Sequence, residues 1–90
     1  MQMVHIVAVI TAKPGMRDKL LEAFKNNVPA VLAEDGCIEY QPTIDTDDGG
    51  PAQTIYGENT FVVIEKWESM AALKAHAVSP HMKSYAEKAK

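Results

Sequence analysis

The sequence contains a single cysteine, Cys37, among its 90 residues. One cysteine excludes an internal disulfide and leaves no set of thiolates that could hold a metal ion. A composition of this kind is typical of proteins in a reducing compartment. No basic and then apolar segment precedes the first predicted strand. We therefore expect a cytoplasmic location.

Basic clusters and long apolar runs are also missing. The formal net charge is -3, and Lys and Arg never form a block longer than two residues. This pattern argues against nucleic acid or an acidic membrane surface as a partner. No apolar run approaches the ~20 residues that a membrane span needs. A small-molecule partner fits the composition better.

Hydrophobic residues, in contrast, make up 47% of the chain. A domain of this length buries only about 60 to 65% of the surface that its unfolded chain exposes, so the core is small. Residues 3–12 are nevertheless apolar on both alternating faces. We expect this strand to be covered on both sides, and the surplus apolar surface suggests a protein partner.

The hydrophobic periodicity predicts one α+β domain over residues 1–90, with the order β-α-β-β-α(α). The predicted helices should cover one side of an antiparallel sheet. The expected strands are residues 3–12, 37–44 and 60–68, and the expected helices are 16–33, 70–77 and 80–88. Residues 45–59 are rich in turn-forming residues and should form an excursion over the surface or over a pocket mouth.

Proline and glycine refine these expectations. Pro29 should kink or restart the first helix, and Gly36 suits a left-handed cap after it. Pro42 makes the second strand an edge strand or a bulged one. In that strand one face should be covered, formed by Ile38, Tyr40, Pro42 and Ile44.

Three stretches carry a resemblance to a known family: VPAVLAEDGCIEY, FVVIEKWES and LKAHAVSPHMKSYAEKAK. They resemble the antibiotic biosynthesis monooxygenase superfamily, and most closely its small bacterial quinol monooxygenases, which share VP-x-VL-x-E-x-GC, IE-x-WES and AH-x-x-(S/T)PHMK. The match spans nearly the whole chain. Members of the family usually continue with another strand after the terminal helix, whereas this sequence ends at Lys90.

The resemblance implies a ferredoxin-like fold whose open sheet pairs with a second copy to form a dimeric α/β barrel. It also implies oxidation of a quinol or related aromatic hydroquinone by O2, with no flavin, haem or metal cofactor. The substrate pocket is expected between the sheet and the helices.

Two histidines are the candidate catalytic bases. His81 is predicted near the start of the terminal helix, where free backbone N–H groups favour a neutral imidazole that can take a proton from a substrate hydroxyl. The alternative is a histidine that only caps or packs beside the helix start. His76, at the end of the preceding helix, either fixes the helix corner or has a polar role in the pocket. Because Pro80 breaks the helix between them and no carboxylate follows at ligand spacing, we expect no metal site.

The strand 60–68 supplies a third catalytic candidate, Glu65, which shares one face with Phe61 and Trp67. Glu65 either relays a proton or forms a salt bridge with Lys or Arg. Trp67 either stacks on a flat substrate ring or fills the core. The candidate substrate contacts are Trp67, Phe61, Tyr40 and Tyr85.

Three functions remain open at this point. The leading one is a cofactor-free monooxygenase or oxidase acting on a quinol with O2, either by hydroxylation or by simple oxidation. The second is a dimeric small-ligand-binding or stress-response module without catalysis. The third is haem degradation, which the sequence favours least because Tyr85 and Ala86 stand where haem-degrading relatives have the proximal histidine.

Overall fold

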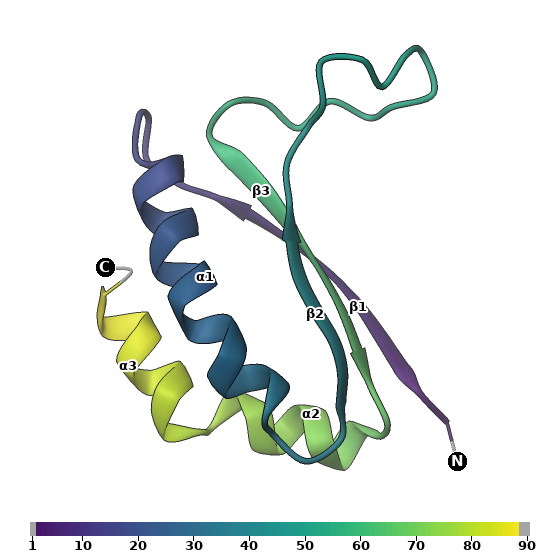
Figure 1. The fold of residues 1–90 in the computed structure, drawn as a ribbon, viewed down its shortest axis with the longest axis vertical. Helices are drawn as coiled ribbons and strands as arrows, with labels where there is room; N and C mark the ends of the chain where they lie inside the picture. Colours follow the sequence, from purple (N-terminus) through teal and green to yellow (C-terminus); the bar gives the residue numbers. More distant parts are fainter. Residues whose placement is uncertain (1, 89–90) are drawn as a thin grey trace.

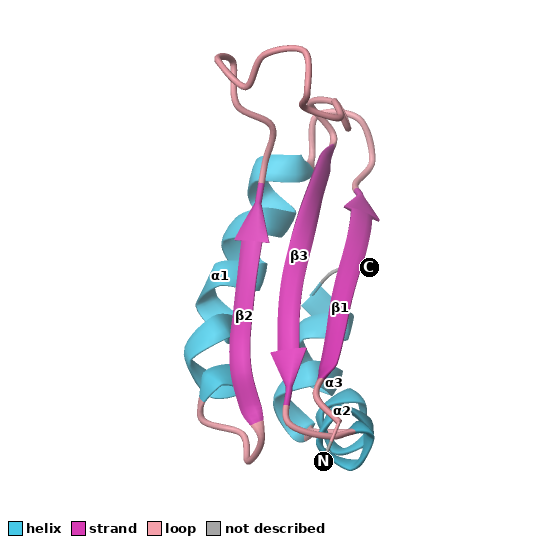
Figure 2. Ribbon diagram, turned by 90° about the vertical axis from the view of Figure 1, so that its right-hand side faces the viewer, coloured by secondary structure: helices cyan, strands magenta, loops and turns pink. Residues whose placement is uncertain are grey.

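The molecule consists of two layers, a three-stranded sheet and three helices that cover one of its faces (Figures 1 and 2). The structure, a computed structural model, describes residues 2–88. The elements in chain order are β1 (Val4–Thr11), α1 (Arg17–Leu32), β2 (Cys37–Thr43), β3 (Thr60–Trp67), α2 (Met70–Ala77) and α3 (Pro80–Lys88). The α+β class is confirmed. Among residues 2–88, every helix is too short or too polar to cross a lipid bilayer.

Strand β3 lies at the centre of the sheet, which has the order β1-β3-β2 and is antiparallel throughout. Its side chains alternate between the two faces. Phe61, Val63, Glu65 and Trp67 point toward the helices and are all buried, as the sequence predicted. Two helix residues, Phe24 and Val31, complete the packing against them. This central strand therefore carries most of the small core.

Aromatic rings form the middle of that core. The ring of Phe24 stacks on Tyr40, with centroids 5.1 Å apart, and meets Phe61 edge to face at 5.4 Å. Tyr85 of α3 approaches the same ring edge to face at 5.8 Å. Such contacts add about 0.5 to 1.5 kcal/mol each beyond the burial of their area. The aromatic cluster thus joins α1 and α3 to the sheet.

Helix α1 runs through Pro29 as one continuous element, so of the two predicted alternatives, a kink or a restart, the restart is wrong. Phe24 and Val31, on either side of the proline, are both buried in the core. Tertiary packing of an apolar helix face outweighs the loss of one backbone hydrogen bond.

Strand β2 is an edge strand, as Pro42 predicted, but its covered face differs from the expected one. A bulge between Cys37 and Glu39 inserts an extra residue and reverses the alternation at the start of the strand. Cys37 therefore packs against the core, and Ile38 is exposed. Tyr40 and Pro42 keep the predicted face, while Ile44 lies beyond the strand end and is exposed.

The segment between β2 and β3 forms the long excursion that the turn residues predicted, and it projects beyond the end of the sheet (Figure 1). The carboxylate of Asp45 accepts hydrogen bonds from the backbone N–H groups of Tyr56 (3.0 Å) and Gly57 (2.8 Å). These bonds close the base of the excursion.

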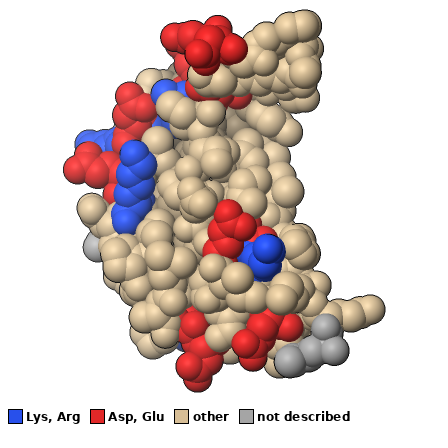
Figure 3. Space-filling view, turned by 45° about the vertical axis from the view of Figure 1, so that its right-hand side comes forward, with Lys and Arg blue, Asp and Glu red and all other residues tan. Residues whose placement is uncertain are grey.

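The outer face of the sheet, opposite the helices, is apolar and open in the single chain. Val7 and Val9 of β1 are 64% and 52% exposed. They pair with Ile64 and Val62 of β3, which therefore lie on the same face. Most of the surface in the middle of Figure 3 is uncharged, but one acidic and one basic side chain lie next to each other there. The expectation that β1 is covered on both sides is not met within one chain.

The turn between α1 and β2 passes very close to α2. Gly36 has φ +86°, the left-handed conformation that the sequence predicted. A Cβ atom at this position would lie 2.6 Å from the Cβ of Ala72, so the close approach requires glycine. The carbonyl oxygen of Gly36 also accepts a hydrogen bond from the N–H of Glu68 at 2.8 Å.

We expect Gly36→Ala to lower the free energy of unfolding by about 2 to 4 kcal/mol, since it adds both backbone strain and a clash with Ala72. Gly15→Ala is the matched control, because Gly15 has φ +78° but no atom near its missing Cβ. This control should cost only about 1 to 2 kcal/mol. Urea unfolding monitored by circular dichroism measures both values. Equal losses would show that the approach to Ala72 is unimportant.

Candidate active site

One carboxylate oxygen joins the two predicted histidines. Oε2 of Glu34 lies 2.8 Å from Nδ1 of His76 and 2.6 Å from Nε2 of His81. A carboxylate only accepts hydrogen bonds, so each of these ring nitrogens carries the hydrogen. In a neutral ring, the nitrogen left with a lone pair is therefore Nε2 of His76 and Nδ1 of His81. We call these three residues the Glu34 cluster.

Three different elements bring the cluster together. Glu34 follows α1 in the turn that ends at Gly36, His76 lies in the last turn of α2, and His81 lies in the first turn of α3. Ser79 connects the two histidines. Its hydroxyl donates to the carbonyl oxygen of His76 (2.8 Å), and its oxygen lies 3.2 Å from Nε2 of His81. The tight turn between α2 and α3 thus directs both rings toward Glu34.

Exposure increases across the cluster from His76 to His81. The side chains of His76, Glu34 and His81 are 7%, 13% and 26% exposed. The His76 ring is covered by Trp67, with centroids 4.6 Å apart, and by Tyr40 at 5.4 Å. His81 is therefore the member of the cluster that a solute can reach.

His81 lines a pocket of about 150 Å³ between α1 and α3. Its other lining residues are Ala23, Asn26, Asn27, Ser84 and Tyr85. Burial raises the pKa of the Tyr85 phenol, so this hydroxyl keeps its proton and can donate a hydrogen bond. Tyr85, one of the candidate substrate contacts, thus lines the same pocket as His81.

The remaining candidates lie between the sheet and the helices. The carboxylate of Glu65 accepts a hydrogen bond from the Trp67 indole N–H (2.9 Å), a different partner from the Lys or Arg considered as its alternative. Phe61 and Trp67 are both 0% exposed. Burial, and next the charge of Glu65, raise the pKa of the Tyr40 phenol. A substrate can touch these rings only if other side chains move.

The location of the pocket therefore differs from the expected one. Aromatic side chains occupy the space between the sheet and the helices. The pocket that contains His81 opens instead between two helices. The structure brings together His76, His81, Trp67 and Tyr40, and it connects Glu65 to this group through the indole. Phe61 contacts Phe24 deeper in the core.

Glu34 is the site residue that sequence reasoning missed. The argument against a metal site considered only carboxylates that follow the two histidines at ligand spacing in the sequence, and so it did not consider Glu34. Glu34 lies 42 and 47 residues away from them in the chain. Its only signal was its place in the motif VP-x-VL-x-E-x-GC, to which no role was attached. The three ligand atoms of the cluster all lie within 4.8 Å of one another.

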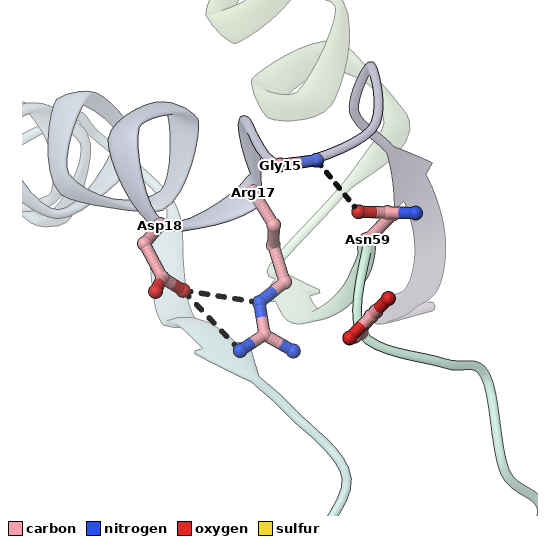
Figure 4. A pocket seen from close by; sticks show the side chains of 5 residues that line it. Gly15, Arg17, Asp18 and Asn59 are labelled. Atoms are coloured by element: carbon pink, nitrogen blue, oxygen red, sulfur yellow. Dashed lines mark hydrogen bonds and ion pairs between the residues drawn. The ribbon is translucent and has the colours of Figure 1, made fainter.

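A second pocket, of about 250 Å³, lies at the opposite end of α1 (Figure 4). Arg17 pairs there with Asp18 at 3.2 Å, and the side-chain oxygen of Asn59 accepts a hydrogen bond from the Gly15 N–H at 3.1 Å. An ion pair with an exposed partner of this kind contributes about 0 to 1 kcal/mol. None of the predicted site residues lines this pocket, so we assign the candidate site to the Glu34 cluster.

Comparison with known proteins tests the family resemblance. The family model described as antibiotic biosynthesis monooxygenase matches residues 3–88. The chain is 41% identical over 90 residues to the probable quinol monooxygenase YgiN of Escherichia coli strain K12. The aligned region covers 98% of this chain and 86% of that protein.

Solved structures agree with the sequence match. PA3566 from Pseudomonas aeruginosa is 28% identical, with a TM-score of 0.74 over 91% of this chain and 74% of that one. Rv0793 from Mycobacterium tuberculosis is 25% identical, with a TM-score of 0.77 over 98% of this chain and 80% of that one. The chain belongs to the antibiotic biosynthesis monooxygenase family.

Proposed function

We propose that this chain is a cofactor-independent monooxygenase or oxidase that acts on a quinol or a related aromatic hydroquinone with O2. The observation that carries the proposal is the Glu34–His81 hydrogen bond at the edge of a pocket. The family of the chain and the name of its E. coli relative support the reaction class and the substrate class.

His81 is the general base in this proposal. Nδ1 accepts the proton of a substrate hydroxyl, and Nε2–H keeps its hydrogen bond to Glu34. The carboxylate stabilises the positive charge that forms on the ring, which is how a carboxylate supports a histidine base in other enzymes. General bases of this kind accelerate reactions by about 10²- to 10⁴-fold. His81 is thus catalytic, and Glu34 is a positioning residue.

The proton transfer prepares the substrate for O2. Loss of a proton gives an electron-rich quinolate, which passes one electron to O2 and forms a semiquinone and superoxide. Transfer of the second electron and proton from the semiquinone to superoxide gives a quinone and the hydroperoxide anion, which takes back the proton held by His81 and becomes H2O2. Combination of the two radicals and loss of water instead gives a hydroxylated quinone, with one oxygen atom from O2 in each product. Both outcomes consume one O2 per quinol.

The pocket offers donors for the substrate oxygens. Tyr85, Asn26 and Asn27 line it with His81, and the Tyr85 phenol is held in its protonated form by burial. His76 shares the Glu34 carboxylate and holds it in place from the buried side. Glu65 orients the Trp67 indole that covers the His76 ring. Trp67, Tyr40 and Phe61 would contact a substrate only after a shift of the surrounding side chains.

A homodimer is part of the same proposal. The outer face of the sheet exposes Val7 and Val9. A contiguous exposed apolar patch often marks a site of protein–protein interaction. A second copy whose sheet packs against this face would give the dimeric α/β barrel that the resemblance implies.

We expect His81→Ala to lower catalysed O2 uptake by at least 100-fold, because the base is lost. The measurement uses an oxygen electrode, purified protein treated with a chelator, and a reduced naphthoquinol, with autoxidation subtracted. His5→Ala is the control, since His5 is exposed, lies on β1 and does not line the pocket. Uptake equal to autoxidation for several quinols would contradict the proposal and favour a ligand-binding module without catalysis.

Glu34→Gln should lower the same rate by about 10- to 100-fold, since the amide cannot stabilise a charged imidazole as a carboxylate does. The double variant Glu34→Gln/His81→Ala should be no slower than His81→Ala alone, because Glu34 acts through His81. Multiplicative losses in the double variant would show that Glu34 acts independently of the ring.

Val7→Glu should weaken the dimer at least tenfold, because a buried unpaired carboxylate is costly. Sedimentation velocity over a range of protein concentrations measures the effect. Met70→Glu provides the control, since Met70 is an exposed apolar residue at the start of α2 and lies outside the sheet. A wild-type monomer at about 50 μM, a concentration at which even weak specific complexes form, would contradict the homodimer.

A further inference from the structure

We propose that the Glu34 cluster binds a zinc ion, and that the bound ion inhibits the enzyme by removing the base. Zinc is here a reversible ligand of the site and takes no part in the reaction. The binding depends only on the three side chains. The inhibition rests on the proposed function, so the two are tested separately.

The donor set fits zinc. Two imidazole nitrogens and one carboxylate oxygen are a common set for Zn²⁺ sites that keep a fourth position open. The cluster supplies these three atoms within 4.8 Å of one another. Tetrahedral Zn²⁺ with bonds of about 2.0 to 2.1 Å places its ligand atoms about 3.3 Å apart.

Two of the three distances between ligand atoms are close to this requirement, and the two nitrogens lie within 4.8 Å of each other. Oε2 of Glu34 now lies 2.8 and 2.6 Å from the two nitrogens, at hydrogen-bond separation. The oxygen must therefore withdraw by roughly half an ångström from each nitrogen to admit the ion. Rotation of the Glu34 side chain allows this movement, because Glu34 lies in a turn and its side chain has three rotatable bonds.

The two histidines are held in place. His76 lies under Trp67, and the hydroxyl of Ser79 donates to its carbonyl oxygen. His81 follows two residues after Ser79 and points its Nε2 toward the same carboxylate. The site would thus have two fixed ligands, His76 and His81, and one adjustable ligand, Glu34. Because Glu34 is distant from the histidines in the sequence, the site exists only in the folded chain. Zinc should therefore raise the melting temperature.

An ion can reach the cluster from the pocket. His81 is 26% exposed and lines the pocket between α1 and α3. Water from that pocket can occupy the fourth position. A site with one carboxylate and two neutral imidazoles leaves a bound Zn²⁺ with a net charge of +1.

Zinc binding changes the tautomer of His81. The ion must bind the lone pair of Nε2, so the hydrogen of a neutral ring moves to Nδ1. Nδ1 is the atom that accepts the substrate proton in the proposed mechanism. With a hydrogen on Nδ1 and a metal on Nε2, the ring has no lone pair left, and the base is lost.

Titration of metal-free protein with Zn²⁺ in isothermal calorimetry tests the binding, with Co²⁺ as a coloured substitute whose visible absorption reports four-coordinate geometry. We expect one ion per chain and a dissociation constant of about 10 μM or tighter. Glu34→Gln and His81→Ala should each weaken binding at least tenfold. His5→Ala, which removes the one histidine outside the cluster, should leave the dissociation constant unchanged.

Circular dichroism of each variant first confirms that it is folded, and Glu34→Gln preserves the shape of the side chain. A wild-type dissociation constant weaker than about 100 μM would overturn the site. So would unchanged binding by folded Glu34→Gln and His81→Ala, or an equal loss in His5→Ala.

Oxygen uptake by the same preparations tests the inhibition. Zinc at ten times its dissociation constant should lower the catalysed rate about tenfold, because about nine tenths of the sites are occupied. Full activity of zinc-loaded protein would overturn the inhibition while the binding stands. Absence of uptake in zinc-free protein would overturn the proposed function, and the inhibition with it, whereas the calorimetric result still decides the binding.

Discussion

The close approach of the turn after α1 to the start of α2 is the constraint on which the candidate site depends. Gly36 takes a left-handed conformation and lies where a side chain would collide with Ala72. The hydrogen bond from the N–H of Glu68 to the carbonyl oxygen of Gly36 holds the turn against the end of β3. Glu34 stands two residues earlier, so this contact brings its carboxylate to the histidines of α2 and α3. The position of the Glu34 carboxylate therefore depends on this close approach.

The burial of the Glu34 cluster determines which nitrogen of each histidine ring carries the hydrogen. A carboxylate that is only 13% exposed needs donors, and the two imidazoles provide them. Because both N–H groups point inward at one oxygen, the lone pair of His81 is left on Nδ1. The same convergence places three possible ligand atoms around one point. In our proposals, proton transfer by His81 and binding of a divalent cation both follow from this one geometry, so a metal would compete with the reaction.

Local patterns predicted the fold well, and they failed where a contact joins distant segments. Alternation placed Phe61, Glu65 and Trp67 on one face of β3, and the last two helices have the predicted bounds, 70–77 and 80–88. The bulge at the start of β2 could not be predicted, because it depends on how that strand pairs with β3, and it moved Ile38 to the exposed side. Glu34 was visible in a motif, but its partners lie more than 40 residues away, so only the folded chain shows what it does.

The two faces of β3 have different roles: the inner face supports the candidate site, and the outer face belongs to the surface proposed for the dimer. Its inner face holds the indole that covers His76. On its outer face, Val62 and Ile64 lie beside Val7 and Val9 of β1, which are the exposed apolar residues of this face. A domain of 90 residues has little stability to spare, because so much of its surface stays in contact with water. In the proposed dimer, burial of the outer face adds apolar area without touching the Glu34 cluster on the helical side. Association then stabilises the strand that supports the site while its chemistry stays within one chain, so each subunit carries a complete cluster.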